Sequence, residues 1–221
     1  NPDDFTMDAD AARELINENT SAIYPVNIFG LPGDMEAYQR LADEHGLALI
    51  FDSAQGLGSI YAGVSEGNFG HGETFSLSPT KVVTAIEGGL ITTNNDELAY
   101  RIRYMRDYGK APDGEDMNWL GLSARMSEIN AVVGRWSLAR IATWISNRDA
   151  IVKRYRERLS VLPGTSFQAQ PQGRTTAHNY FVMLINPYYA PVSRDELYIM
   201  LKERGVQTKR YFYPALHNQS L

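Results

Sequence analysis

The feature that most constrains the fold is a strand–helix–strand pattern between residues 21 and 51. Residues 21–29 (SAIYPVNIF) are apolar and β-branched enough for a buried strand. Residues 34–45 carry apolar side chains at helical spacing, and Gly46 follows as a helix stop. Residues 47–51 (LALIF) form the continuous apolar run of a strand covered on both faces. The pattern therefore predicts a βαβ unit in an α/β fold with a mostly parallel sheet.

The second predicted strand ends directly in Asp52, which Gln55 follows after two small residues. Ligands of open parallel sheets bind at the carboxyl ends of the strands, so this turn is expected at the ligand edge. Further strands are expected near 74–77 and 88–93, and Asn95 is expected to cap a helix that runs through Asp107.

The second half of the chain is predicted to hold a long helix or helix pair and then a smaller α+β unit. A helical pattern covers 127–159; Asn147-Arg148-Asp149 is the candidate position for a bend, although nothing there forces a break. We expect residues 1–126 to form part of a large domain and 163–221 to form an incomplete small domain. Residues 127–162 are expected to link the two domains as the long helix or helix pair. The elements expected in the last part are a strand at 180–185, a capped helix at 193–204 and a returning strand at 206–213.

Residues 74–89 (TFSLSPTKVVTAIEGG) contain one lysine, Lys81, among small, hydroxylated and apolar residues. A partly desolvated amine has a lowered pKa and becomes a nucleophile or imine former. The hydroxyls of Ser76, Ser78 and Thr80 add donors for an anionic ligand that bears a carbonyl group. The alternative interpretation is a surface turn with an ordinary lysine.

Asp52 and Lys81 are the residues that would suit pyridoxal phosphate. That cofactor needs a lysine for its aldehyde and a carboxylate opposite its pyridine nitrogen. Its phosphate needs several hydrogen-bond donors, which Ser76, Ser78 and backbone amides would supply.

Other chemistries have weaker support. Ser78-Pro79-Thr80-Lys81 matches the S-x-x-K acyl-enzyme motif, but its companions S-D-N and K-T-G do not occur. No H-E-x-x-H and no glycine-rich dinucleotide fingerprint occurs, and no metal-ligand spacing is formed by the four histidines, His45, His71, His178 and His217. We therefore expect no metal site.

The composition is that of a globular protein, with 43% hydrophobic and 21% charged residues. A net charge of -5 gives no general attraction to nucleic acid or to anionic membranes. No apolar run approaches the roughly 20 residues of a membrane span, no signal peptide opens the chain, and cysteine is absent. These observations predict a cytoplasmic location, with neither nucleic acid nor membrane as a partner.

Several motifs occur together and in order, and they resemble the pyridoxal-phosphate-dependent sugar aminotransferases of the DegT/DnrJ/EryC1/StrS family. That family carries D-x-A-Q/H, a serine before the lysine, P-T-K-x-x-x-x-x-E-G-G, and G-x-N-x-R-M-S-E. The tail at 194–217 (RDELYIMLKERGVQTKRYFYPALH) is also similar to the family's tail. The matching residues are Asp52-Ser53-Ala54-Gln55, Ser76, Pro79-Thr80-Lys81, Glu87-Gly88-Gly89 and Gly121-Leu122-Ser123-Ala124-Arg125-Met126-Ser127-Glu128.

The resemblance implies a role for each matched site residue. Lys81 would hold the cofactor's aldehyde as an imine and then move the proton as general base and acid. Asp52 would pair with the pyridinium nitrogen, Gln55 would lie near the phenolic oxygen, and Ser76 would bind the phosphate. Ser123 stands where the family usually has an asparagine that reaches the phosphate of the neighbouring subunit.

The resemblance also implies an aspartate-aminotransferase-like fold of type I, with the chain a fragment that lacks the family's N-terminal portion. The implied activity converts a nucleotide-linked keto-sugar to an amino sugar with glutamate as amino donor, leaving 2-oxoglutarate, in a homodimer with shared active sites. Two alternatives stay open: a non-catalytic sensory or structural relative, and an aminotransferase acting on a cyclitol or aminobenzoate precursor.

Overall fold

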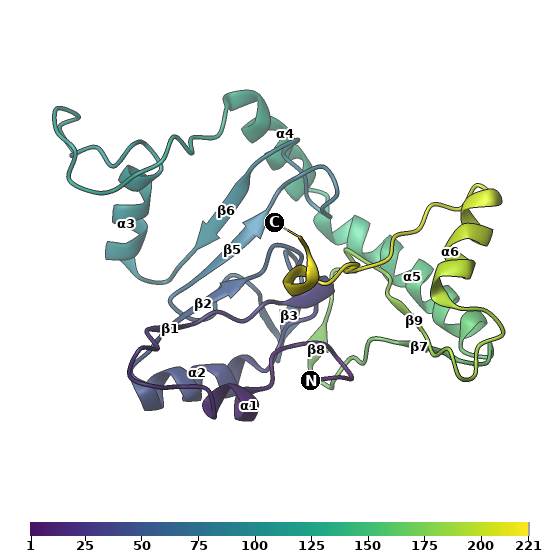
Figure 1. Cartoon of the computed structure of the whole chain (residues 1–221). Coiled ribbons are helices and arrows are strands. Elements are labelled where there is room, and N and C mark those ends of the chain that lie inside the picture. The colour runs from purple at the N-terminus through teal and green to yellow at the C-terminus, as the bar shows by residue number, and fades with distance from the viewer. Residues whose placement is uncertain (221) are drawn as a thin grey trace. The chain divides into compact units, whose positions relative to one another are not determined.

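The computed structural model describes residues 1–220 (Figure 1). The chain divides into two compact units, each formed by two stretches of sequence. The first unit comprises residues 1–151 and 169–181, and the second comprises residues 152–168 and those from 182 onward. The expected division at residues 126 and 162 stays a prediction.

The first unit is built on a sheet with the strand order β1-β2-β5-β6. β1 pairs in parallel with β2, and β2 in parallel with β5, whereas β6 is antiparallel to β5. The mixed α/β architecture with a mostly parallel sheet confirms the predicted fold class. The strands are β1 (Ala22–Ile23), β2 (Ala48–Asp52), β5 (Gly72–Ser76) and β6 (Gly89–Thr92).

Helix α2 (Met35–His45) covers one face of this sheet, next to the short α1 (Ala9–Arg13) (Figure 1). Asp34 caps α2 by accepting a hydrogen bond from the Ala37 amide, and Gly46 ends it with the left-handed φ of 63° that glycine tolerates. The buried face of α2 packs against strand side chains in one apolar cluster. Its members include Met35, Tyr38, Leu41, Ala42, Leu49 and Phe51.

The predicted first strand is shorter than expected. Only Ala22 and Ile23 belong to β1, and Val26 makes an isolated bridge to Asp52. Pro25 has no amide hydrogen to give to the ladder, and the chain then turns through the 3-10 helix η1 (Ile28–Gly30).

Besides the helices between residues 127 and 159, the first unit contains three further strands and one further helix. The strands form a separate small sheet in the order β4-β3-β8, which ties residues 169–181 to the glycine-rich segment after β2. Asn95 caps α3 (Asp96–Met105) by accepting from the Leu98 amide, as predicted. The small-sheet strands are β3 (Ile60–Tyr61), β4 (Val64–Ser65) and β8 (Arg174–Thr175).

The helical pattern at 127–159 forms two helices, α4 (Glu128–Leu138) and α5 (Ile141–Leu159). The break lies before Ile141, and α5 continues through the candidate position, residues 147–149, where the sequence does not force a break. Their polar side chains do not cap a helix end. Instead, Arg148 donates to the carbonyl of His178, and the Asp149 carboxylate lies 3.3 Å from the His178 ring nitrogen.

The second unit contains a two-stranded antiparallel sheet of β7 (Thr165–Phe167) and β9 (Met183–Ile185), with helices α6 (Arg194–Glu203) and η2 (Leu216–Asn218). Ser193 and Glu196 form the expected capping box at the start of α6.

The predicted strand at 206–213 is wrong: residues 206–210 are irregular, 211–212 form a turn and 213 lies in a bend. Side chains, not a backbone ladder, attach this segment to α6. The Arg210 guanidinium lies 5.0 Å from the Tyr198 ring and 3.4 Å from the Asp195 carboxylate. Arg194 lies 4.6 Å from the Tyr213 ring.

Candidate active site

Lys81 lies in the lysine loop, residues 77–88, which connects β5 to the antiparallel β6. The loop is closed at its base, where the Leu77 amide donates to Gly88 O at 2.9 Å and the Ala85 amide donates to Leu77 O at 2.9 Å. After Lys81, Val82, Val83 and Ala85 are buried and residues 86–88 are exposed, and Leu77, Val83 and Ala85 form one apolar cluster. Lys81 is itself half-buried, so the loop is not an ordinary surface turn.

Two side chains from distant parts of the chain hold the lysine loop. The Val82 amide donates to Asn179 Oδ1 at 2.9 Å, and the Thr84 amide donates to Ser137 Oγ at 3.0 Å. Neither acceptor was identified from the sequence. No local pattern distinguishes them, because Ser137 lies within a helix and Asn179 in an irregular stretch.

A hollow beside the loop brings together three of the predicted site residues, Gln55, Ser76 and Lys81. Gln55 is oriented by the Phe29 amide, which donates to its Oε1 at 2.6 Å and leaves Nε2 as the end available to donate. The other residues that line the hollow are Ala54, Leu57, Val82, Val83 and Asn179.

Asp52 is the last residue of β2, at the carboxyl edge that the sequence predicted. It pairs with Thr74 of β5, and Ser76 lies two residues further along that strand, so all three residues share one face of the sheet. Asp52 Oδ1 accepts from the Ala54 amide at 3.0 Å. Its side chain is not among those that line the hollow.

Ser76 and Ser78 place two hydroxyl groups at the entrance to the lysine loop. Ser76 Oγ donates to Ser78 Oγ at 3.3 Å and accepts from the Ser78 amide at 3.4 Å. Residues 78–81 make only a single turn, with the Lys81 amide donating to Ser78 O at 3.1 Å. Acyl-enzyme chemistry would require the S-x-x-K motif to lie on a helix, and here it does not.

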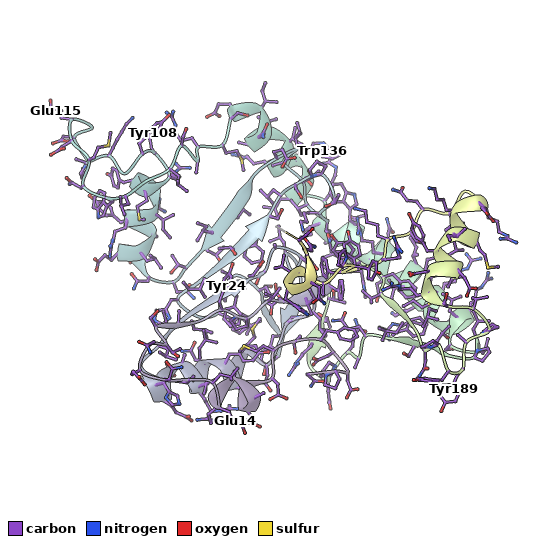
Figure 2. The ribbon with its side chains drawn as sticks, viewed as in Figure 1. Glu14, Tyr24, Tyr108, Glu115, Trp136 and Tyr189 are labelled. Atoms are coloured by element: carbon purple, nitrogen blue, oxygen red, sulfur yellow. The ribbon has the colours of Figure 1, made fainter. Side chains whose placement is uncertain are left out.

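Ser123 is not in the hollow but on an exposed segment between α3 and α4. Its hydroxyl donates to Tyr108 Oη at 3.0 Å. This hydrogen bond, together with the Arg125 guanidinium, lowers the pKa of Tyr108 below the ordinary tyrosine value. Figure 2 shows Tyr108 and Glu115 on the same connecting segment.

The hollow has the donor chemistry that a phosphorylated aldehyde requires. It presents an amine, a hydroxyl and an amide, with a strand-end carboxylate on the adjacent sheet face. In addition, Asn179 Nδ2 is a buried donor that has no hydrogen-bond partner within residues 1–220. A buried unpaired donor is costly, and an acceptor on a bound group would satisfy it. The chemistry of these residues therefore fits pyridoxal phosphate, whereas the hollow as it stands, at about 10 Å³, has the volume of a single water molecule.

Other classes of site find no support in the part of the chain that the structure describes. Residues 1–220 contain no cluster of three or more histidine, aspartate or glutamate side chains placed to hold a metal ion. Within the same residues, every helix is too short or too polar to cross a membrane.

The chain belongs to the DegT/DnrJ/EryC1/StrS aminotransferase family, whose model matches residues 1–221. The resemblance of the motifs is thereby confirmed. The dTDP-4-amino-4,6-dideoxy-D-glucose transaminase of Shigella dysenteriae is 32% identical over 203 residues, 92% of this chain and 55% of that protein. The GDP-perosamine synthase of Caulobacter vibrioides is 32% identical over 218 residues, 96% of this chain and 58% of that protein.

The fold is shared with solved structures. The crystal structure of S. venezuelae DesV superposes with a TM-score of 0.91 at 31% identity, and covers 99% of this chain and 57% of DesV. The chain thus spans between 55% and 58% of the length of these three proteins.

Proposed function

We propose that this chain is part of a pyridoxal-phosphate-dependent aminotransferase that converts a nucleotide-linked keto-sugar to an amino sugar. The observation that carries the proposal is the hollow in which Lys81 meets Ser76 and Gln55 beside the strand-end Asp52. Membership of the family and the names of the similar transaminases support the same activity.

When bound, pyridoxal phosphate supplies an aldehyde and an electron-accepting pyridinium ring. The Lys81 amine would hold the aldehyde carbon and would move a proton at the substrate carbon that carries nitrogen. The Asp52 carboxylate would keep the ring nitrogen protonated, and its Oδ2 is the oxygen that the Ala54 amide does not occupy. The Ser76 hydroxyl, which here donates to Ser78 Oγ, would turn to the phosphate, and Gln55 Nε2 would donate to the phenolic oxygen.

The amino donor we propose is glutamate, which leaves as 2-oxoglutarate after giving up its amino group. The sugar ketone then receives that amino group, so the two half-reactions balance. We also propose a homodimer in which Ser123 completes the partner's phosphate site, because Ser123 lies on an exposed segment away from its own chain's hollow.

The experiment is an absorbance titration of the complete protein with pyridoxal phosphate. The wild type is expected to show a band near the visible edge, and Lys81→Ala is expected to lose the band and the transfer of amino groups. The matched control is Lys202→Ala, on the exposed surface of α6, which should retain both. Absence of the band in the wild type would reject the proposal.

A second assay separates the alternatives. Turnover of glutamate with nucleotide keto-sugars supports the proposed enzyme, whereas a cofactor band without turnover of any amino donor supports a sensory or structural relative. Turnover that is limited to cyclitol or aminobenzoate precursors supports the third interpretation. The same panel identifies the sugar and the nucleotide.

A further inference from the structure

Two glutamates are buried behind the turn that follows β2, and the proposed chemistry uses neither. Glu73 lies on β5 with 0% of its surface exposed, and Glu66 follows β4 with 6% exposed. Buried carboxyl groups are costly unless they are paired or neutral. The two side chains differ in how the fold compensates for that cost.

Glu73 is held as a well-satisfied carboxylate. Its Oε2 accepts from Ser53 Oγ at 2.8 Å, and its Oε1 accepts from the amides of Gly67 at 2.6 Å and Phe69 at 2.8 Å. Hydrogen bonds donated to a carboxylate favour its charged form, so these three donors oppose the effect of burial. Burial still raises the pKa of Glu73 above the ordinary glutamate value.

Glu66 is compensated less well. Neither of its buried carboxyl oxygens has a hydrogen bond of normal geometry within residues 1–220, because the Ser53 hydroxyl donates to Glu73. Burial, and next the negative charge of Glu73, raise the pKa of Glu66 well above its ordinary value. Glu73 is the charged group that acts on Glu66. Hydrogen bonding by Ser53 and Asn27, which do not ionise in the working range, lowers the pKa of Glu66 but does not offset burial and the charge of Glu73.

Both glutamates contact the turn that carries Asp52 and Gln55. Ser53, between those two residues, donates to Glu73 and accepts from Asn27 Nδ2 at 2.8 Å. Glu66 packs directly against Gly56, where an added Cβ would lie 1.7 Å from Glu66 Oε2. The turn is thus supported from behind by two carboxyl groups.

We propose that Glu66 and Glu73 hold one proton between them, carried by Glu66, and that this pair positions the turn bearing Asp52 and Gln55. Ionisation of Glu66 would place two negative charges in the same buried space, and the turn contacts both carboxyl groups through Ser53 and Gly56. The proposed link to cofactor binding rests on the proposed function; the shared proton does not.

The first experiment measures thermal unfolding of the complete protein without cofactor, between about pH 5 and about pH 9. A group with a raised folded-state pKa stabilises below its unfolded pKa, and that stability is lost as the pH rises through the folded-state pKa. Glu66→Gln has no proton to lose, so its melting temperature relative to wild type should rise with pH. A difference that stays constant with pH would overturn the shared proton.

Glu73→Gln is the matched control. It removes the negative charge that acts on Glu66 and replaces Oε2, the acceptor of the Ser53 hydroxyl, with an NH2 group, whereas its remaining amide oxygen can still accept from the Gly67 and Phe69 amides. Because the charge of residue 73 raises the pKa of Glu66, the pH-dependent gain of Glu66→Gln should be smaller in a Glu73→Gln background. An equal gain in both backgrounds would contradict the assignment of the charge to Glu73.

The second experiment measures pyridoxal phosphate affinity of wild type and Glu66→Gln over the same pH range. Ionisation of Lys81 and of the cofactor changes the Kd of both proteins equally, so these effects cancel in the ratio of the two Kd values. The ratio of wild-type to variant Kd should rise by up to about tenfold per pH unit once Glu66 ionises. A constant ratio would overturn the positioning role. A wild type that binds no cofactor at any pH would instead reject the proposed function, and the melting comparison would still decide the shared proton.

Discussion

The lysine loop (residues 77–88) and the connecting segment between α3 and α4 (residues 106–127) both carry proposed site residues, yet they are held very differently. The lysine loop is fixed by backbone bonds at its base and by the buried side chains of Ser137 and Asn179. The connecting segment pairs mainly with itself and the end of α3, for example through Tyr108 N to Leu122 O at 3.0 Å.

Their apolar side chains show the same contrast. Leu77 in the lysine loop is 3% exposed, whereas Leu120 and Leu122 in the connecting segment are 92% and 74% exposed. Exposed apolar area contributes nothing to the stability of this chain, because only area removed from water does. The lysine loop is therefore organised by the chain's own core, and the exposed leucines of the connecting segment fit the proposed contact with a second subunit.

The largest expected effect compares two leucine truncations. Leu77→Ala should lower the free energy of unfolding by about 2–5 kcal/mol, because it removes buried contacts and leaves a cavity. Leu120→Ala should change it by no more than about 0.5 kcal/mol in the isolated chain. Urea unfolding of both variants measures the difference. Equal losses would mean that the connecting segment is packed as tightly as the lysine loop.

The next effect compares two asparagines that bond to the same loop. Asn179→Ala leaves the buried Val82 amide without an acceptor and should cost about 1–3 kcal/mol of unfolding free energy. Asn130→Ala removes an exposed bond to Glu87 O and should cost about 0.5–1.5 kcal/mol at most. Chemical denaturation ranks the two, and a reversed order would contradict the assigned burial.

The smallest effect concerns the pKa of Tyr108. Ser123 donates a hydrogen bond to the phenolic oxygen and favours the phenolate, and Arg125 adds a positive charge, so the pKa of Tyr108 is lowered. Ser123→Ala should raise it toward the ordinary tyrosine value. The measurement is a tyrosinate difference titration against Tyr108→Phe in each background. An unchanged midpoint would show that the Ser123 hydroxyl does not face the phenol.

Much of the fold was accessible from local pattern. The helix at 35–45 and its glycine stop, the strand ending in Asp52, and the capping boxes and caps at Ser193 and Asn95 all follow from residues adjacent in sequence. The wrong strand at 206–213 and the candidate bend at 147–149 have one feature in common. In both places, polar or aromatic side chains contact residues of other elements, and no local rule registers such contacts.

The candidate site divides in the same way. The sequence motifs were enough to identify Lys81, Asp52, Gln55 and Ser76, because the motifs of the family are short runs of neighbouring residues. The roles of these four residues stay proposals. Only the tertiary structure showed that Asn179 and Ser137 hold the lysine loop, and that Glu66 lies unpaired beside Glu73 behind the turn. Hydrogen bonds and buried charge depend on which distant groups share a space, and a linear order of residues does not specify that space.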